Sequence, residues 1–240
     1  MERVEKPISV LSPQERRQRN REEMQGAILE AARQVMREQG VAALSLREVA
    51  RRVKIQAPSL YAYYPSKTAL YDALFLEGIR TYVSFRNSIT AGHTSFWDIV
   101  HTWVETYMRF AQEHPELYQL CFERPVPGFV PSEASMEASR RLLAGSEEIL
   151  AQALANGEIR LDLPNDQARD LIIAMMHGLT SQHMANEPNL PVGSGRYGRL
   201  VPAAVALFRA AWEPGQPTTP GPDSPSHQDS GDSAGKEVGD

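Results

Sequence analysis

Two prolines enclose a short segment that sets narrow limits on how this chain can fold. Pro58 suits the first turn of a helix, where its missing N–H is no loss, and Pro65 disfavours helical geometry in the residue before it. The segment therefore predicts a helix of about two turns, after which Ser66 caps the next helix. In a helix this short, only Leu60 and Tyr64 share a face that can point inward. The other side chains are left for solvent or for a binding partner.

The residues before this segment predict two more helices. Apolar residues recur at helical spacing over residues 21–39, and Gly40 supplies the left-handed residue that ends a helix. Ser45 stands three residues before Glu48, which is the capping-box spacing, and opens a second helix over residues 46–53. Two short helices joined by a tight turn and supported by a longer first helix form a helix-turn-helix, whose second helix enters the major groove of DNA.

In the order of these motifs, the region resembles the N-terminal domain of the TetR family of bacterial repressors. The resemblance runs from about residue 27 to 74 and rests on the helix ending in Gly40, on SLREVA at 45–50 and on LYAYYPSK at 60–67. It implies a homodimeric, ligand-responsive repressor that binds a palindromic operator and is released by a small-molecule effector. One residue departs from the family, which usually has glycine where this chain has Lys54; lysine is uncommon in the left-handed conformation.

The charge of the chain is divided in a way that agrees with DNA binding by its N-terminal part. Residues 1–70 contain 13 Lys and Arg against 8 Asp and Glu, a net charge of +5, whereas residues 71–240 contain 12 against 22, a net charge of −10. Phosphate attraction dominates non-specific affinity for DNA, so we expect the basic part to contact DNA and the acidic part to face away.

Roles at the DNA follow from position. Ser45 and Lys67 are placed to contact phosphates, as is the hydroxyl of Tyr61, while Arg47 can reach either a phosphate or a base. The resemblance implies the same backbone contacts for Tyr61 and Lys67. The residues expected to face base edges are Gln56, Ala57, Ser59, Ala62 and Tyr63. For Tyr63 a packed aromatic at the helix end is the alternative.

The rest of the chain predicts further helices and no strands, so the expected fold is all-α. The expected domains are a flexible basic arm (1–20), the helix-turn-helix domain (21–70), a helical effector-binding and dimerisation domain (71–212) and a disordered tail (213–240) rich in Pro, Gly and Ser. The helices of the second domain are expected at 66–87, 95–113, 115–122, 132–156, 164–185 and 195–212. Basic arms can enter a minor groove, although the arginines at 16, 17, 19 and 21 also fit a solvated charge run.

The last two predicted helices carry too much apolar surface for one domain to bury. A strip of small residues in the first of them would let another helix approach closely: Ala174, Gly178, Ser181 and Ala185. In the family that this chain resembles, the last two helices of each subunit form a four-helix dimer interface, which implies a homodimer here. The pair His177-Gly178 also resembles a subgroup of the effector domains named for a Trp-His-Gly signature.

Aromatic residues and methionines of the middle section are candidates for an effector cavity between helices, with an ordinary packed core as the alternative for each. They would suit a small apolar or aromatic effector and are Trp103, Tyr107, Phe110, Tyr118, Phe122, Met136, Met175, Met176 and His177. A buried, hydrogen-bonded structural role is the competing interpretation for His177. Cys121 is interpreted as a core thiol, with a redox sensor as the alternative.

No catalytic constellation, metal site or cofactor motif is found, so an enzyme is the least favoured class. No two histidines have the i, i+4 spacing, and no phosphate-binding or nucleophile-elbow motif is present. The single cysteine fits a reducing compartment, and no segment reads as a signal peptide or a membrane span. We therefore expect a soluble, cytoplasmic protein that does not bind membranes. The alternative function is a helical DNA-binding protein without a small ligand, controlled by a protein partner.

Overall fold

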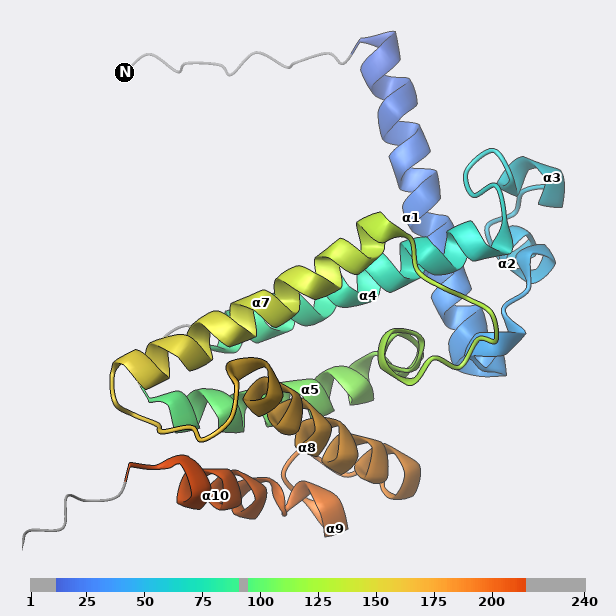
Figure 1. Cartoon of the computed structure of the whole chain (residues 1–240). Helices are drawn as coiled ribbons and strands as arrows, with labels where there is room; N and C mark the ends of the chain where they lie inside the picture. The colour runs from blue at the N-terminus through green and yellow to red at the C-terminus, as the bar shows by residue number, and fades with distance from the viewer. Residues whose placement is uncertain (1–11, 91–94, 215–240) are drawn as a thin grey trace, which may run out of the picture.

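A computed structural model describes residues 12–90 and 95–214 of the chain, and within these ranges it contains helices and no strands (Figure 1). The predicted all-α fold is therefore confirmed. The first part of the expected basic arm and almost all of the expected tail lie outside the described residues. In the part of the chain that is described, no helix is both long and apolar enough to cross a membrane.

The first helix begins earlier than the sequence suggested. Helix α1 spans Pro13–Gln39, so residues 13–20, expected in a flexible arm, are helical. Ser12 explains the difference, because its side chain accepts a hydrogen bond from the Glu15 N–H while the Glu15 carboxylate accepts one from the Ser12 N–H at 2.7 Å. Pro13 fits the first position of the helix. The exposed first turns of α1 project beyond the rest of the fold (Figure 1).

The helix-turn-helix consists of α2 (Leu46–Arg52) and α3 (Ala57–Leu60), which follow the short 3₁₀ helix η1 (Val41–Ala43). The α3 segment is one regular turn rather than two, although Tyr64 N–H still donates to the Leu60 carbonyl at 3.0 Å. Both inward-facing residues are buried as predicted. In the turn, Lys54 adopts φ of 58°, the left-handed conformation that glycine accepts more readily.

The second domain contains seven α-helices within the described residues: α4 (Lys67–Thr90), α5 (Phe96–Glu113), α6 (Pro115–Tyr118), α7 (Glu133–Ala155), α8 (Asn165–Asn186), α9 (Gly195–Gly198) and α10 (Val201–Trp212). A five-residue π-helical turn, η2 (Gln119–Glu123), directly follows α6. The prediction of a single helix over 195–212 is wrong, because this segment divides into α9 and α10. Pro202 lies in the first turn of α10, where a proline is tolerated, and it prevents a continuous helix through this point.

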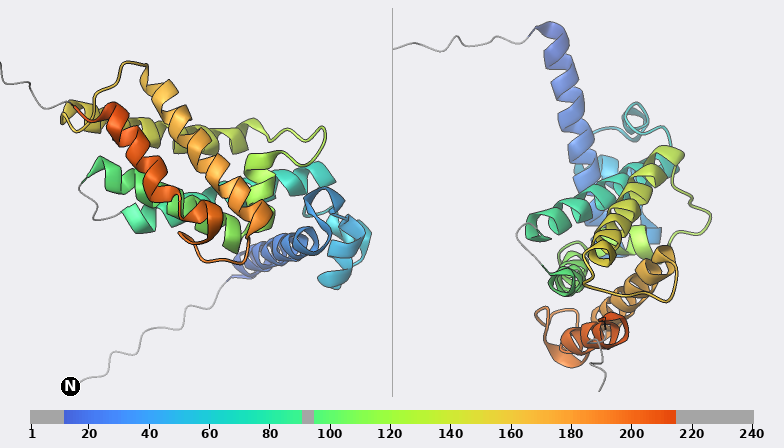
Figure 2. Two further views of the ribbon diagram at one scale, coloured as in Figure 1. Left: turned by 90° about the horizontal axis from the view of Figure 1, so that it is seen from below. Right: turned by 60° about the vertical axis from the view of Figure 1, so that its left-hand side comes forward.

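The helices pack so that one end of the second domain meets the DNA-binding domain. Helix α4 leads out of the helix-turn-helix and runs beside α7, while α8 and α10 lie together on one face (Figures 1 and 2). Buried residues of α1, α2 and the first turns of α4 form one continuous core, to which Leu120 of η2 is added from the second domain. The two domains are thus joined by shared apolar packing.

Candidate DNA-binding surface and effector cavity

Most of the residues expected at the DNA are exposed on the helix-turn-helix. Tyr61 is 51% exposed, which leaves its hydroxyl available to a phosphate oxygen. The other exposed members of the set are Arg47, Gln56, Ser59, Ala62 and Lys67. They come from the start of α2, from α3 and the turn after it, and from the start of α4. Together they define one exposed surface of the helix-turn-helix.

The remaining three expected DNA contacts are partly buried. Tyr63 packs against the core, and the Arg21 guanidinium lies 5.4 Å from its ring centroid. Arg21 also donates from Nη2 to the Ala62 carbonyl at 3.0 Å. Tyr63 therefore has the features of the packed helix-end aromatic that the sequence left open, and Ala57 is also partly packed against the core. Through Arg21, helix α1 is tied directly to the segment that follows α3.

The third of these, Ser45, caps α2 as predicted, but the capping box is only half formed. Its side chain accepts from the Glu48 N–H at 3.5 Å, while the Glu48 carboxylate is held by Arg51 and Arg52 at 2.6–2.9 Å. Hydrogen bonds from these two arginines lower the pKa of Glu48 to about 2. The positive charges of Arg51 and Arg52 are thus paired with a carboxylate of their own helix.

A cavity of about 240 Å³ lies in the second domain between α4, α5, α7 and α8. Four residues of the predicted set line it: Trp103, Tyr107, Phe122 and Met176. Half of the remaining lining residues are leucine or isoleucine, and most of the remaining wall comes from α7 and α8. The cavity therefore has the apolar, concave character of ligand sites in helical bundles.

The other five residues of the predicted set lie elsewhere. Phe110 and Tyr118 are fully buried in the aromatic core beside the cavity, and Met175 is partly packed against the same core. Met136 lines a smaller cavity of about 120 Å³. His177 is held by tyrosines: its Nδ1 lies 3.1 Å from the Tyr107 hydroxyl and 3.4 Å from the Tyr118 hydroxyl. These contacts favour the structural interpretation of His177.

The walls that α4 and α7 supply were not predicted from the sequence. Aromatic and methionine content drew attention to α5 and α8, whereas the α7 wall consists of leucines and serines. The cavity-lining residues that were not predicted include Ile79, Tyr82, Arg86, Ser139, Leu142, Leu143, Ser146, Leu150, Arg169, Ile172 and Ile173. One signal was readable, because Arg86 follows Ile79 and Tyr82 at spacings of seven and four and so falls on the apolar face of α4.

Cys121 lies where the two cavities meet, since both are lined by Cys121 and Ser139. Burial raises the pKa of the Cys121 thiol, and its Sγ lies 3.5 Å from the Phe75 carbonyl. Reactive cysteines need a lowered pKa, so this environment is that of a core thiol.

A cluster of charges connects the second domain to the DNA-binding domain. Glu116 of α6 has a side chain with 0% exposure, and its two oxygens accept from Arg33 at 2.9 Å and from Arg37 at 2.8 and 3.0 Å. Burial opposes ionisation of Glu116, but the hydrogen bonds outweigh it, so its pKa is lowered. Arg33 further contacts Glu77 at 3.1 Å and His114 at 2.9 Å. Helices α1, α4 and α6 thus meet at these ion pairs.

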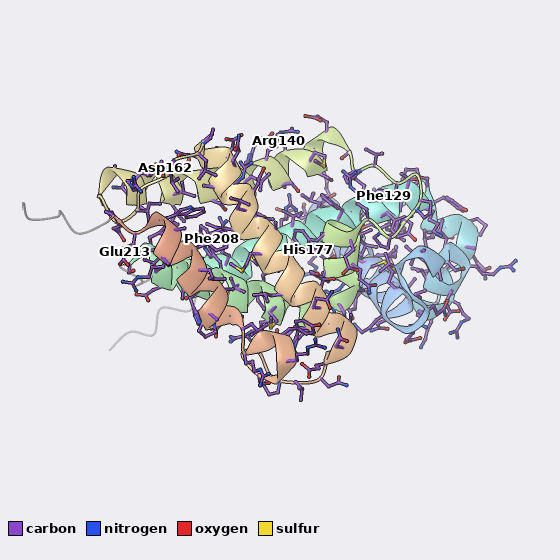
Figure 3. All side chains as sticks on the ribbon, turned by 60° about the horizontal axis from the view of Figure 1, so that its bottom comes forward. Phe129, Arg140, Asp162, His177, Phe208 and Glu213 are labelled. Carbon is purple, nitrogen blue, oxygen red and sulfur yellow. The ribbon has the colours of Figure 1, made fainter. Side chains whose placement is uncertain are left out.

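One face of the second domain exposes apolar residues from its last helices. Leu171 in the second turn of α8 is 48% exposed, Leu200 just before α10 is 41% exposed and Leu207 within α10 is 74% exposed. In the small-residue strip, Ala174, Gly178 and Ala185 are exposed and Ser181 is partly buried. The two helices lie on the same face (Figures 2 and 3).

Two family models match the chain. Residues 28–74 match the bacterial regulatory proteins of the tetR family, and residues 100–196 match the tetracyclin repressor-like C-terminal domain. Together these matches cover more than half of the chain, and each corresponds to one of the two domains described above.

Similar proteins agree with this division. The HTH-type transcriptional regulator Rv1816 of Mycobacterium tuberculosis is 27% identical over 146 residues, which are 59% of this chain and 62% of that regulator. Among solved structures, a Rhodococcus protein of unknown function has a TM-score of 0.67 at 21% identity, covering 88% of this chain and 100% of that one. The transcriptional regulator FadR of Bacillus subtilis has a TM-score of 0.63 at 16% identity, covering 76% and 96%.

Proposed function

The chain belongs to the TetR family of transcriptional regulators, and from this premise we propose that it is a homodimeric repressor that binds a palindromic operator and is released by a small-molecule effector. The observation that carries the proposal is the combination, in one chain, of an exposed helix-turn-helix surface and an apolar cavity joined by a buried ion-pair cluster. The protein would act in the cytoplasm, where bacterial operators are found.

The DNA contacts proposed for the repressor are those of the exposed surface. Tyr61 and Lys67 contact phosphates, as the family pattern implies, and Gln56 and Ser59 face base edges in the major groove. Arg47 lies at the start of α2 with its side chain exposed and reaches a phosphate or a neighbouring base.

Dimerisation is proposed through α8 and α10. Exposed leucines on both helices and an exposed strip of small residues on α8 lie on one face, where apolar surface of this kind is a liability for a monomer. A two-fold dimer buries the same surface on both subunits and places two recognition segments on one side of the DNA.

The effector is proposed to act through the segment that links the cavity to α1. Phe122 of η2 lines the cavity, η2 directly follows α6, and Glu116 of α6 is bonded to Arg33 and Arg37 of α1. A ligand that binds more tightly when η2 is in one position therefore also favours one position of α1. The position of α1 in each subunit in turn sets the spacing between the two α3 segments of the dimer. FadR of Bacillus subtilis, which shares the fold, was solved in complex with stearoyl-CoA.

The test is to capture genomic DNA fragments on the purified protein and to sequence them. The proposal predicts that short inverted repeats are enriched, and that a Gln56→Ala/Ser59→Ala double variant loses this enrichment while it still retains DNA non-specifically at low salt. Enrichment without any inverted repeat would contradict the dimeric repressor. If no small molecule raises the melting temperature or releases the captured DNA, control by a protein partner is the better account.

A further inference from the structure

The smaller cavity, of about 120 Å³, lies at the junction of the two domains, between α4, η2, α7 and the segment 124–131. Phe75 of α4 and Leu120 of η2 line it, and both belong to the core that is shared with α1 and α2. Phe122, in the same π-helical turn as Leu120, lines the larger cavity of about 240 Å³. A single π-helical turn, a feature that is frequent at functional sites, therefore borders both cavities.

The two cavities follow each other along the same pair of helices. On α4, Phe75 lines the smaller cavity while Ile79 and Tyr82 line the larger one, and spacings of four and three residues place these side chains on one face. On α7, which runs beside α4 (Figure 1), the two linings extend from Met136 in the smaller cavity to Leu150 in the larger one. Since a helix rises 1.5 Å per residue, together they follow about 20 Å of α7.

Two small side chains form the boundary between the cavities. Cys121 of η2 and Ser139 of α7 line both of them. The thiol lies against α4, because its Sγ is 3.5 Å from the Phe75 carbonyl and a Cβ atom at Gly78 would lie 2.5 Å from the same sulfur. Glycine within a helix is destabilising relative to alanine, and the close approach of the thiol accounts for its presence here. A chain that passes this boundary therefore has to displace only a thiol and a hydroxyl group.

We propose that the two cavities form one site for an elongated, unbranched aliphatic effector, whose chain passes the boundary at Cys121 and reaches Phe75 and Leu120. The inference rests on the proposed function and assigns the shape and chemical class of its ligand. If each non-hydrogen atom takes about the 30 Å³ of a water molecule in the liquid, the larger cavity holds about eight such atoms and the two cavities about twelve. Apolar side chains predominate in both linings, which favours an aliphatic chain.

The experiment titrates the full-length protein with 1-octanol, 1-dodecanol and cyclododecanol and follows tryptophan fluorescence, since Trp103 lines the larger cavity. Burial of each additional methylene group tightens binding about three- to four-fold, so 1-dodecanol should bind about 100-fold more tightly than 1-octanol. Cyclododecanol has as many carbon atoms as 1-dodecanol, but its ring is too wide to pass the boundary between the cavities. It should therefore bind at least about 10-fold more weakly than 1-dodecanol, because it leaves the smaller cavity unfilled.

A variant at the boundary tests the passage itself. Ser139→Leu places a larger side chain between the cavities, so the gain in affinity from 1-octanol to 1-dodecanol should fall to less than about 5-fold, the value of roughly one methylene group. Ala144→Leu adds the same side chain at an exposed position of α7 and is the matched control, which should keep the parental gain. The readout is a ratio of two affinities, so a general loss of stability does not imitate the expected result.

The comparison of the three alcohols on the parent protein needs no variant, so it decides the matter even if Ser139→Leu fails to fold. The proposal is overturned if 1-dodecanol binds no more tightly than 1-octanol or cyclododecanol, if none of the three binds, or if folded Ser139→Leu keeps the full gain. Release of operator DNA by cyclododecanol and not by 1-dodecanol would refute the elongated ligand and leave the ligand-responsive regulator standing. DNA that stays bound although 1-dodecanol occupies the site would instead contradict the proposed function.

Discussion

Replacement of Glu116 by glutamine removes the negative charge at the centre of the contact between the two domains. The side chain is fully buried, and its oxygens accept three hydrogen bonds from Arg33 and Arg37 at 2.8–3.0 Å. Glutamine has nearly the same shape, so the packing of α6 is preserved. Its amide group, however, places a donor where the arginines also donate, and one of the two acceptors is lost.

The size of the effect follows from the burial of the two arginines. Arg33 is 14% exposed, so its guanidinium cannot regain full hydration when its partner is lost. Arg37 is 44% exposed, so water screens its interaction with Glu116 and this interaction contributes less. Loss of hydrogen bonds to a charged group of this kind costs about 2 kcal/mol. For a chain of this size the melting temperature should fall by about 4–8 °C.

The assay is thermal unfolding followed by circular dichroism, with Glu30→Gln as the matched control. Glu30 also contacts Arg33, at 3.6 Å, but its side chain is 54% exposed, so its loss should change the melting temperature by no more than about 1–2 °C. If Glu116→Gln melts within 1 °C of the parent, or no lower than Glu30→Gln, the ion-pair cluster does not stabilise the contact between the domains.

Four further outcomes are expected. Lys67→Ala should weaken binding to all DNA sequences about equally and reduce the slope of log affinity against log salt by roughly one, measured by fluorescence anisotropy; an unchanged slope would exclude a phosphate contact. Gly178→Leu should weaken the dimer by about 5- to 150-fold in sedimentation because of overpacking. The effect should be confined to the dimer, since no described atom beyond the chain neighbours of Gly178 and the backbone of its own helix lies within 4 Å of a Cβ placed there. Burial and the neighbouring Arg33 lower the pKa of His114, so the unfolded state binds the proton more tightly than the folded state. The contribution of neutral His114 to the free energy of unfolding should therefore be full above about pH 6.5 and decrease below it. His114→Asn should flatten this pH dependence in denaturant titrations, and an unaltered dependence would assign it to other groups. Lys54→Gly should raise the melting temperature by about 1–4 °C, because φ of 58° is strained for lysine; a lower melting temperature would mean that the turn is not strained.

The DNA-binding domain was predictable because its signals are local. Prolines, caps and the spacing of Leu60 and Tyr64 act within a few residues, and they set helix ends and inward faces before any tertiary contact forms. The errors were local as well. Helix α1 begins at Pro13 and not at residue 21, because Ser12 caps it. The segment predicted as one helix over 195–212 divides before α10, because Pro202 lies in the first turn of a new helix.

The cavity was only partly predictable because it depends on which faces of four helices meet. Trp103, Tyr107, Phe122 and Met176 were found from their residue type, but side chains of the same type, such as Phe110, turned out to be core. No local pattern distinguishes an aromatic residue at a cavity from one beside it.

The central claim is that two copies of this helix-turn-helix bind successive major grooves as one dimer. Its most direct test is to take the captured operator and to insert about five base pairs, half a helical turn, between its half-sites. Because the second half-site then faces the opposite side of the duplex, affinity should fall by more than about 100-fold toward the non-specific level, and insertion of about ten base pairs should restore part of it if the dimer can span the longer distance. Equal affinity for the parent operator and the half-turn insertion would contradict the account.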